Sequence, residues 1–120
     1  MAGAPQYLIV LYIEEQRLDP PIPPSNVADG VGKSAPATTE MLQRLEAKGL
    51  VTYEPYAGAT LTARGRETAA DLHERYVTLS WFFRDVLDLD DYEREAMELA
   101  GAVSGDVSAR LTDVLLTPDE

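Results

Sequence analysis

The stretch that decides the fold runs from residue 33 to residue 66 and reads KSAPATTEMLQRLEAKGLVTYEPYAGATLTARGR. Ser34 is a favourable N-cap, and Pro36 falls in the first helical turn, where its missing N–H leaves no helical hydrogen bond unmade. Gly49 is a favourable helix stop. The predicted helix has an apolar inward face made of Met41, Leu42 and Leu45. The opening of this stretch therefore predicts a well-capped helix.

The second part of the same stretch predicts a β-hairpin that leads into another helix. Residues 51–56 and 60–62 have the composition of two short strands, with Ala57-Gly58 at the hairpin tip. A long helix is expected from Thr62 to about Leu87. A capped helix, a glycine stop, a hairpin and a further helix, in this order, predict a winged helix-turn-helix.

The residues before this stretch predict two further helices. The first ends near Arg17 and has an apolar face made of Tyr7, Leu8, Val10, Leu11 and Ile13. Residues 19–24 contain four prolines, which cannot continue a helix. A short helix is then expected over residues 26–31, with Ser25 as N-cap and Gly32 as the stop.

The C-terminal half is expected to be entirely helical. The long helix has apolar positions at three- or four-residue spacing: Ala69, Leu72, Tyr76, Leu79, Phe83 and Val86. Asp90 is expected to cap a fifth helix to about Ala102, and Ser104 or Asp106 a sixth to about Leu116. The predicted fold class is mainly α, with a winged helix-turn-helix DNA-binding domain (residues 1–66) and a helical dimerisation region (residues 67–120).

The charge of the chain is unevenly distributed. Its 120 residues contain 10 Lys+Arg and 21 Asp+Glu, a net charge of −11. Residues 25–66 contain five basic and four acidic residues, a net charge of +1, which leaves −12 for the remainder. A polyanion could therefore approach only the 25–66 surface. The alternative is that this segment is simply neutral surface.

The composition also limits the class of protein. There is no cysteine, which excludes disulfides and thiolate metal sites. No apolar run is as long as a membrane span and the first residues are unlike a signal peptide, so we expect a cytoplasmic protein. The excess of acidic residues suits a halophilic source. One histidine without cysteine leaves little acid–base or nucleophilic chemistry, so we expect no enzyme.

The second helix of a helix-turn-helix lies in the major groove, with its N-terminal residues at the base edges. The candidate DNA-binding residues are accordingly Lys33, Ser34, Pro36, Ala37, Thr38, Thr39, Gln43 and Arg44, together with Gly58, Arg64 and Arg66 at the wing. Glu40 does not fit this role well, because phosphates repel a carboxylate unless it accepts from a cytosine amino group. The expected wing is the hairpin tip Tyr56-Ala57-Gly58, which has no basic residue. The alternative is that the serine and threonines are ordinary cap and surface residues.

Aromatic residues gather on the long helix. They suit a helix packed in a dimer core, with Tyr76, Leu79, Trp81, Phe83 and Met97 as candidate interface residues. The alternative is a small-molecule pocket beside Tyr76 and Trp81.

Four segments of the chain resemble the metal-dependent repressor family of the diphtheria toxin repressor and manganese transport regulator type. They are YLIVLYIEE (7–15), SAPATTEMLQRLEAKGLV (34–51), YEPYAGATLTARGR (53–66) and VLDLD (86–90). The resemblance covers about residues 5–116 and implies a homodimer that binds palindromic operators when Fe²⁺ or Mn²⁺ is present. It is closest to the short form of the family, without the SH3-like domain.

The resemblance departs from the family at the metal site. The positions where the family has metal ligands hold Gln6, Tyr76, Ser80, Met97, Ala100 and Gly101, with Glu93 at an additional position. Divalent cations need several converging carboxylate, imidazole or thiolate groups. The lone His73 and the acidic residues from Asp90 to Glu98 are better explained as helix surface. We therefore expect no metal cofactor and a metal-independent repressor.

Two other functions stay open from the sequence. A weakly basic helix with Glu40 on its outer face would also fit a protein that dimerises with a metal-sensing relative and inactivates it without binding DNA. The Tyr76 and Trp81 region would fit a small-molecule sensor.

Overall fold

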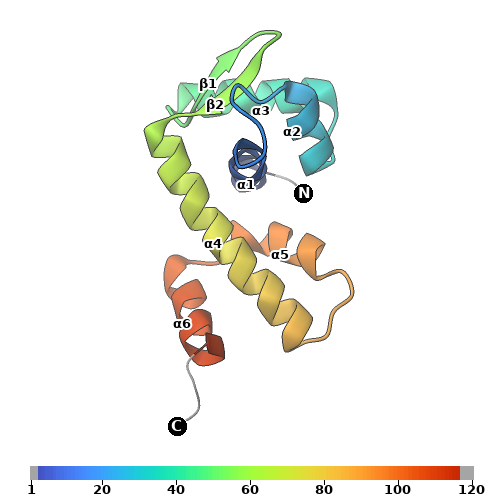
Figure 1. Ribbon diagram of the computed structural model, residues 1–120, viewed down its shortest axis with the longest axis vertical. Helices are drawn as coiled ribbons and strands as arrows, with labels where there is room; N and C mark the ends of the chain where they lie inside the picture. The colour runs from blue at the N-terminus through green and yellow to red at the C-terminus, as the bar shows by residue number, and fades with distance from the viewer. Residues whose placement is uncertain (1–2, 117–120) are drawn as a thin grey trace. The chain divides into compact units, whose positions relative to one another are not determined.

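The structure is a computed structural model that describes residues 3–116, with side chains to residue 113. Its contacts divide the chain into two compact units, residues 1–70 and 71–120. Helix α4 (Ala63–Asp85) continues through the boundary between them (Figure 1). None of the helices over the described residues combines the length and the apolar character that a membrane span requires.

The first unit contains three helices, a two-stranded antiparallel hairpin and the start of α4. Its elements are α1 (Ala4–Glu15), α2 (Pro24–Val31), α3 (Ala35–Ala47), β1 (Val51–Glu54) and β2 (Gly58–Leu61). In Figure 1 the hairpin projects from the helices of this unit, with its turn at the outer end. This is the predicted winged helix-turn-helix in a mainly helical chain, and the predicted fold class is confirmed.

The core of the first unit is built largely from branched aliphatic side chains on α1, α2, α3, β1 and the segment before α2. Those that are fully or almost fully buried are Ile9, Leu11, Ile22, Val27, Leu42, Leu45 and Val51. Burying one such side chain stabilises a fold by roughly 1.5–3 kcal/mol. These residues hold α3 by its inner face and leave its outer face to solvent.

One residue of the proline-rich segment after α1 pairs with β2 as a residue of a third strand would. Ile22 donates its N–H to the Ala59 carbonyl (2.8 Å) and accepts from the Ala59 N–H (3.0 Å). No helix continues through the prolines, as expected, and Ile22 is the residue among them that has an N–H to donate. The edge of β2 opposite β1 is therefore paired at this point.

Thr62 joins the hairpin to α4. Its hydroxyl donates to the Gly49 carbonyl (2.8 Å) and accepts from the Gly65 N–H (3.0 Å), so it caps the new helix. The α4 backbone lies against the turn after α3 here, since a β-carbon on Gly65 would be 1.8 Å from the Leu50 carbonyl oxygen. A glycine is required at residue 65 for this close approach.

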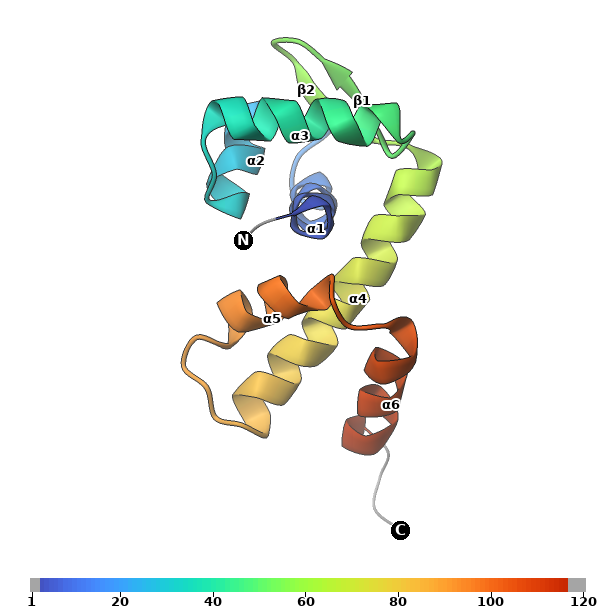
Figure 2. The same ribbon diagram turned by 180° about the vertical axis from the view of Figure 1, so that it is seen from behind.

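The second unit is a three-helix arrangement. It contains the C-terminal part of α4, α5 (Tyr92–Ala100) and α6 (Gly105–Leu116), and in Figure 2 α5 and α6 flank α4. The Arg75 guanidinium donates to the Val103 carbonyl (3.3 Å), and the Thr78 and Thr112 hydroxyls are 3.3 Å apart. Leu72, Leu79, Ala96 and Ala100 are buried.

Two predicted caps are wrong. Helix α2 begins at Pro24 and has Pro23, not Ser25, as its N-cap, because a proline is well placed at the first helical position. Helix α5 follows Asp91 rather than Asp90, and the Asp91 side chain makes no capping hydrogen bond. The predicted caps Ser34 and Ser104 are confirmed, since each hydroxyl accepts the backbone N–H three residues later (3.2 Å).

The predicted ends of both strands at the turn are wrong, since the first strand is shorter there than predicted and the second is longer. Strand β1 ends at Glu54 instead of residue 56, because Pro55 has no N–H and a turn occupies residues 55–57. Strand β2 begins at Gly58 instead of residue 60. The helices also end slightly earlier than predicted, α4 at Asp85 and α5 at Ala100.

Candidate nucleic-acid interface

One face of helix α3 is polar and exposed to solvent, and the opposite face is anchored in the core. Its cap hydrogen bond, from the Ala37 N–H to the Ser34 hydroxyl, sets where the helix begins. Leu42 and Leu45 are fully buried and hold the opposite face. Most of the predicted contact residues at this helix are exposed, namely Lys33, Ser34, Pro36, Ala37, Gln43 and Arg44, and Thr39 is half-buried. The structure therefore brings these residues together on one accessible surface.

Thr38 does not belong to this surface. It is 0 % exposed, and its hydroxyl has no hydrogen-bond partner among the residues that the structure describes. Thr38 lies one turn before Leu42 on the inner face, so its methyl group packs in the core and its hydroxyl cannot reach a DNA groove. The prediction for Thr38 is wrong, and Thr39 is the threonine that stays accessible.

The outer end of the hairpin lies one residue earlier in the chain than the predicted tip at residues 56–58. Gly58 is buried at the start of β2, with a φ of +132°, and a β-carbon there would be 1.9 Å from the Ile22 carbonyl oxygen. Gly58 is thus needed for the close contact with the Ile22 strand and is not the tip. The tip is the turn at residues 55–57, where Tyr56 is completely exposed (105 %).

The two arginines at the start of α4 are held by the chain itself. Arg64 donates to the Lys48 carbonyl (3.3 Å). Arg66 donates to the Glu15 carboxylate (2.8 Å) and to the Leu61 carbonyl (3.3 Å). Both arginines remain exposed to solvent. Arg66 is therefore partly neutralised and is a weaker candidate for a phosphate contact than Arg44.

Glu15 is a structural residue of this surface that sequence reasoning missed. Its other carboxylate oxygen accepts from the Leu61 N–H (2.9 Å), so one carboxylate joins the end of α1 to β2 and to α4. The side chain of Glu15 is only 6 % exposed, whereas that of Arg66 is 50 % exposed. Because Glu15 and Arg66 are 51 positions apart, no local pattern could have revealed the pair.

The candidate dimer residues lie in the second unit, and the structure does not support all of them. Tyr76, Trp81, Phe83 and Met97 are half-buried within the chain. Leu79 is 2 % exposed, so it already belongs to the core of its own unit and the prediction that it contacts a partner is wrong.

The second unit also has a cavity of about 440 Å³ beside α4. Aromatic side chains from α4 and α5 line it, with polar groups from all three helices: Tyr76, Trp81, Tyr92, Ser80, Arg84, Glu93 and Thr112. The Arg84 guanidinium lies 5.7 Å from the centre of the Tyr92 ring and is also paired with Asp85 (2.9 Å). Tyr76 and Trp81, the two residues of the pocket that the sequence leaves open as an alternative, both line this cavity.

The residues at the family's metal-ligand positions do not fit a divalent cation. Gln6 uses its side-chain oxygen to accept the Gly3 N–H (2.7 Å) at the start of α1. Burial, and next the charge of Glu93, raise the pKa of Tyr76, which disfavours the phenolate that a metal would need. Ala100 and Gly101 supply no side-chain donor atom. Within residues 3–116 no three His, Cys, Asp or Glu side chains converge as metal ligands.

His73 and the acidic residues of α5 are engaged elsewhere. The His73 ring is half-buried, its centroid is 6.1 Å from that of Tyr76, and burial lowers its pKa. Arg94 pairs with Asp91, Glu95 and Glu98 along the surface of α5. Both observations agree with ordinary helix surface.

Comparison with known proteins identifies the family. Residues 1–59 match the model of the iron dependent repressor N-terminal DNA binding domain. The uncharacterized HTH-type transcriptional regulator MJ0568 of Methanocaldococcus jannaschii is 33 % identical over 107 residues, which are 88 % of this chain and 86 % of that protein.

Two solved structures show the same fold over almost the whole chain. The manganese regulator SloR matches 98 % of the chain with a TM-score of 0.84 and 29 % identity. A manganese-dependent transcriptional repressor in complex with manganese matches 97 % with a TM-score of 0.85 and 29 % identity. This chain spans about half the length of each, 55 % and 54 %. The chain therefore belongs to the iron-dependent repressor family of helix-turn-helix transcriptional regulators.

Proposed function

We propose that this chain is a sequence-specific DNA-binding repressor that acts as a homodimer and does not require a metal ion. Helix α3 would lie in the major groove and the hairpin would lie along the adjacent backbone or minor groove. The observation that carries the proposal is the outer face of α3, which is polar, exposed and held in place by Leu42 and Leu45. Family membership supports the same assignment.

The surface chemistry of α3 suits a DNA duplex. Ser34, Thr39 and Gln43 offer neutral hydrogen-bonding groups for base edges, and Arg44 and Lys33 offer cations for phosphates. Glu40 is also exposed on this helix and would be repelled by phosphate unless it accepts from a cytosine amino group. The net charge of residues 25–66 is only +1, so we expect moderate affinity with a shallow salt dependence.

The dimer is proposed through the second unit. Eight large apolar side chains are exposed among residues 3–113, and six of them are in this unit: Val77, Val86, Leu87, Leu89, Leu99 and Val107. Together with the half-buried Tyr76, Trp81, Phe83 and Met97, they offer apolar surface that a second copy would remove from water. The winged helix in residues 1–66 would then be presented twice, as a palindromic operator requires.

Metal independence follows from the chemistry of the residues at the ligand positions. A ligand shifts a conformational equilibrium only through a difference in its affinity for the two states. With Gln6 engaged at the α1 cap and with Tyr76, Ala100 and Gly101 at the other positions, Fe²⁺ or Mn²⁺ has no strong site through which to exert such a difference.

The experiment starts with a random-sequence duplex pool, from which the protein enriches an operator. Binding of that duplex is measured by fluorescence anisotropy in excess chelator and in added Mn²⁺, and the mass of the free protein by analytical ultracentrifugation. We expect equal affinity in both conditions and a dimer. A large gain of affinity with Mn²⁺ would refute metal independence, and a monomer would refute the dimer.

A second candidate function is a small-molecule sensor, favoured by the cavity that Tyr76 and Trp81 line. Trp81 is the single tryptophan, so its fluorescence reports directly on that cavity.

A third candidate function is that of an antagonist of a metal-sensing relative. In that case the pure protein should enrich no duplex, and its mixture with such a relative should lose the DNA binding of the relative.

A further inference from the structure

The turn of the hairpin has a conformation that disfavours the residue at its tip. The Ala57 N–H donates to the Glu54 carbonyl (3.0 Å), which closes a four-residue β-turn. Pro55 is the second residue of this turn, and Tyr56, the third, has a φ of +71°. Proline in second place and a positive φ in third place define a type II turn, in which glycine or asparagine is the favoured third residue.

Tyrosine is poorly suited to this position on backbone grounds. A positive φ brings its β-carbon too close to the following backbone, and the aromatic side chain offers no compensating local hydrogen bond. Among the described residues, the other non-glycine with positive φ is Asp88, at +56°. Aspartate tolerates this conformation much better than an aromatic residue does. Strain of this kind persists mainly at functional positions.

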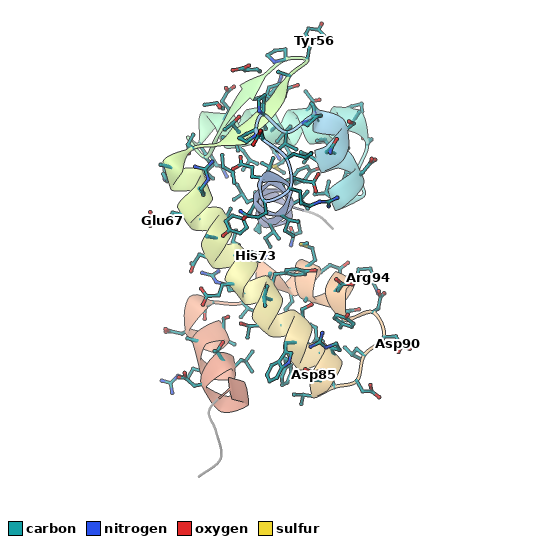
Figure 3. The ribbon with its side chains drawn as sticks, viewed as in Figure 1. Tyr56, Glu67, His73, Asp85, Asp90 and Arg94 are labelled. Atoms are coloured by element: carbon teal, nitrogen blue, oxygen red, sulfur yellow. The ribbon has the colours of Figure 1, made fainter. Side chains whose placement is uncertain are left out.

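The Tyr56 side chain contributes nothing to the packing of the chain. It is 105 % exposed, the highest value among the exposed large apolar residues. In Figure 3 it lies at the outer end of the hairpin and points away from the rest of its unit. An unfavourable backbone and an unpacked ring together indicate that Tyr56 serves a contact outside the chain.

The chemistry around Tyr56 limits the kind of contact. No Lys or Arg lies in β1, the turn or β2, and the nearby Glu54 carboxylate is exposed. The hairpin tip therefore cannot attract phosphates by charge. A phenol hydroxyl can donate a hydrogen bond to a phosphate oxygen, and the ring can pack against a deoxyribose in the minor groove.

We infer that Tyr56 is the contact residue of the wing and that it binds the DNA backbone through an uncharged hydrogen bond and van der Waals contact. The inference depends on the proposed DNA-binding function, and it assigns the contact between the wing and the DNA backbone to one residue. It makes a prediction that an ordinary basic wing does not: the contribution of the wing to affinity is independent of salt concentration, because no counterion is released.

The test measures the affinity of Tyr56→Gly and Tyr56→Phe for the duplex that the wild-type protein enriches from a random-sequence pool, across a series of salt concentrations. We expect Tyr56→Gly to weaken binding by about tenfold, the effect of losing one good contact. Its salt slope should equal that of the wild type. Tyr56→Phe, which keeps the ring and loses the hydroxyl, should lie between the two.

Thermal unfolding of the same variants separates a binding role from a structural one. Because glycine relieves the strain, Tyr56→Gly should melt at the wild-type temperature or up to about 4 °C higher. Asp88→Gly is the matched control, since it makes the same backbone change at the other strained residue. It should bind DNA as tightly as the wild type.

The other possible outcomes of these measurements show whether the role of Tyr56 or the proposed DNA-binding function is wrong. If Tyr56→Gly binds the duplex as tightly as the wild type, or melts at a clearly lower temperature, Tyr56 is not a DNA contact of the proposed kind. A reduced salt slope in Tyr56→Gly would also overturn the inference. If the wild type enriches no duplex at all, the proposed function fails, and this inference with it.

Discussion

The two units of the chain differ sharply in charge. Residues 1–70 contain six basic and eight acidic residues, a net charge of −2, whereas residues 71–120 contain four basic and thirteen acidic residues, a net charge of −9. A polyanion is repelled much more strongly by the second unit than by the first. The strongly negative net charge of the whole chain, −11, therefore does not argue against DNA binding, because most of the negative charge belongs to the second unit.

The units also differ in how their ion pairs relate to the fold. In the second unit, the pairs of Arg75, Arg84 and Arg94 link residues at most four positions apart. In the first unit, Glu15 and Arg66 join elements that are 51 positions apart. The first unit therefore has an ion pair that links distant elements of its tertiary structure, whereas the ion pairs named in the second unit are local to its helices and connections.

The largest expected effect is the loss of stability on replacing Gly58 with alanine. Its φ of +132° and the distance of 1.9 Å from a built β-carbon to the Ile22 carbonyl oxygen leave no room for a side chain. We expect Gly58→Ala to lower the free energy of unfolding by about 3 kcal/mol or more, measured by urea unfolding. Gly32→Ala is the control, with positive φ but no atom within 4 Å, and should cost about 1 kcal/mol. Equal losses would mean that the Ile22 contact is not rigid.

A smaller loss of stability is expected for Glu15→Ala. This change leaves the nearly buried Leu61 N–H without its acceptor and releases Arg66. We expect a loss of about 2 kcal/mol in urea unfolding, mostly from the backbone N–H because Arg66 is half-exposed. In the second unit, Asp71→Ala removes the exposed pair with Arg75 and should change stability by no more than about 0.5 kcal/mol. The contrast between the units fails if Asp71→Ala costs as much as Glu15→Ala.

DNA binding tests the charge contrast directly. We expect Arg44→Ala to weaken binding of the enriched duplex about tenfold, or about 1.4 kcal/mol, and to reduce the salt slope by about 1, because one phosphate contact is lost. Arg94→Ala removes the same charge from α5 and should leave both quantities unchanged. Anisotropy titrations at several salt concentrations give both values. If the two variants lose equal affinity, DNA contact is not confined to the first unit.

The smallest predicted effects have opposite signs in the two units. Thr38→Val removes a buried hydroxyl without a partner and should raise the free energy of unfolding by about 1 kcal/mol. Thr112→Val removes a hydroxyl that is bonded to the Ser108 carbonyl (3.1 Å) and should lower it by about 1 kcal/mol. Urea unfolding distinguishes the two, and a loss in Thr38→Val would show that its hydroxyl has a partner.

The same substitution also separates the two threonines of α3. Operator preference, read from duplexes enriched by each variant, should be unchanged in Thr38→Val and altered in Thr39→Val, because only Thr39 is accessible. An altered preference in Thr38→Val would place its side chain at the DNA after all.

Local sequence patterns predicted the helices and strands well. They predicted less well whether an individual side chain is buried or exposed. The Ser34 cap, the Gly32 and Gly49 stops and the six helices depend on neighbouring residues, so the sequence contains the information. Thr38 could also have been placed correctly, because it continues the stripe of Leu42 and Leu45 at spacings of four and three. Its threonine identity suggested a polar contact, and the helical spacing was the better guide.

The sequence alone determined the order of the elements: a capped helix, a glycine stop, a hairpin and a long helix. It also determined which side chains stand at the family's metal-ligand positions. Both depend only on residue type and spacing. The burial of Gly58 against Ile22 and the Glu15 bridge to β2 and Arg66 were decided only by the tertiary structure. Both depend on which residues far apart in the chain meet, and no short-range preference of the chain specifies those contacts.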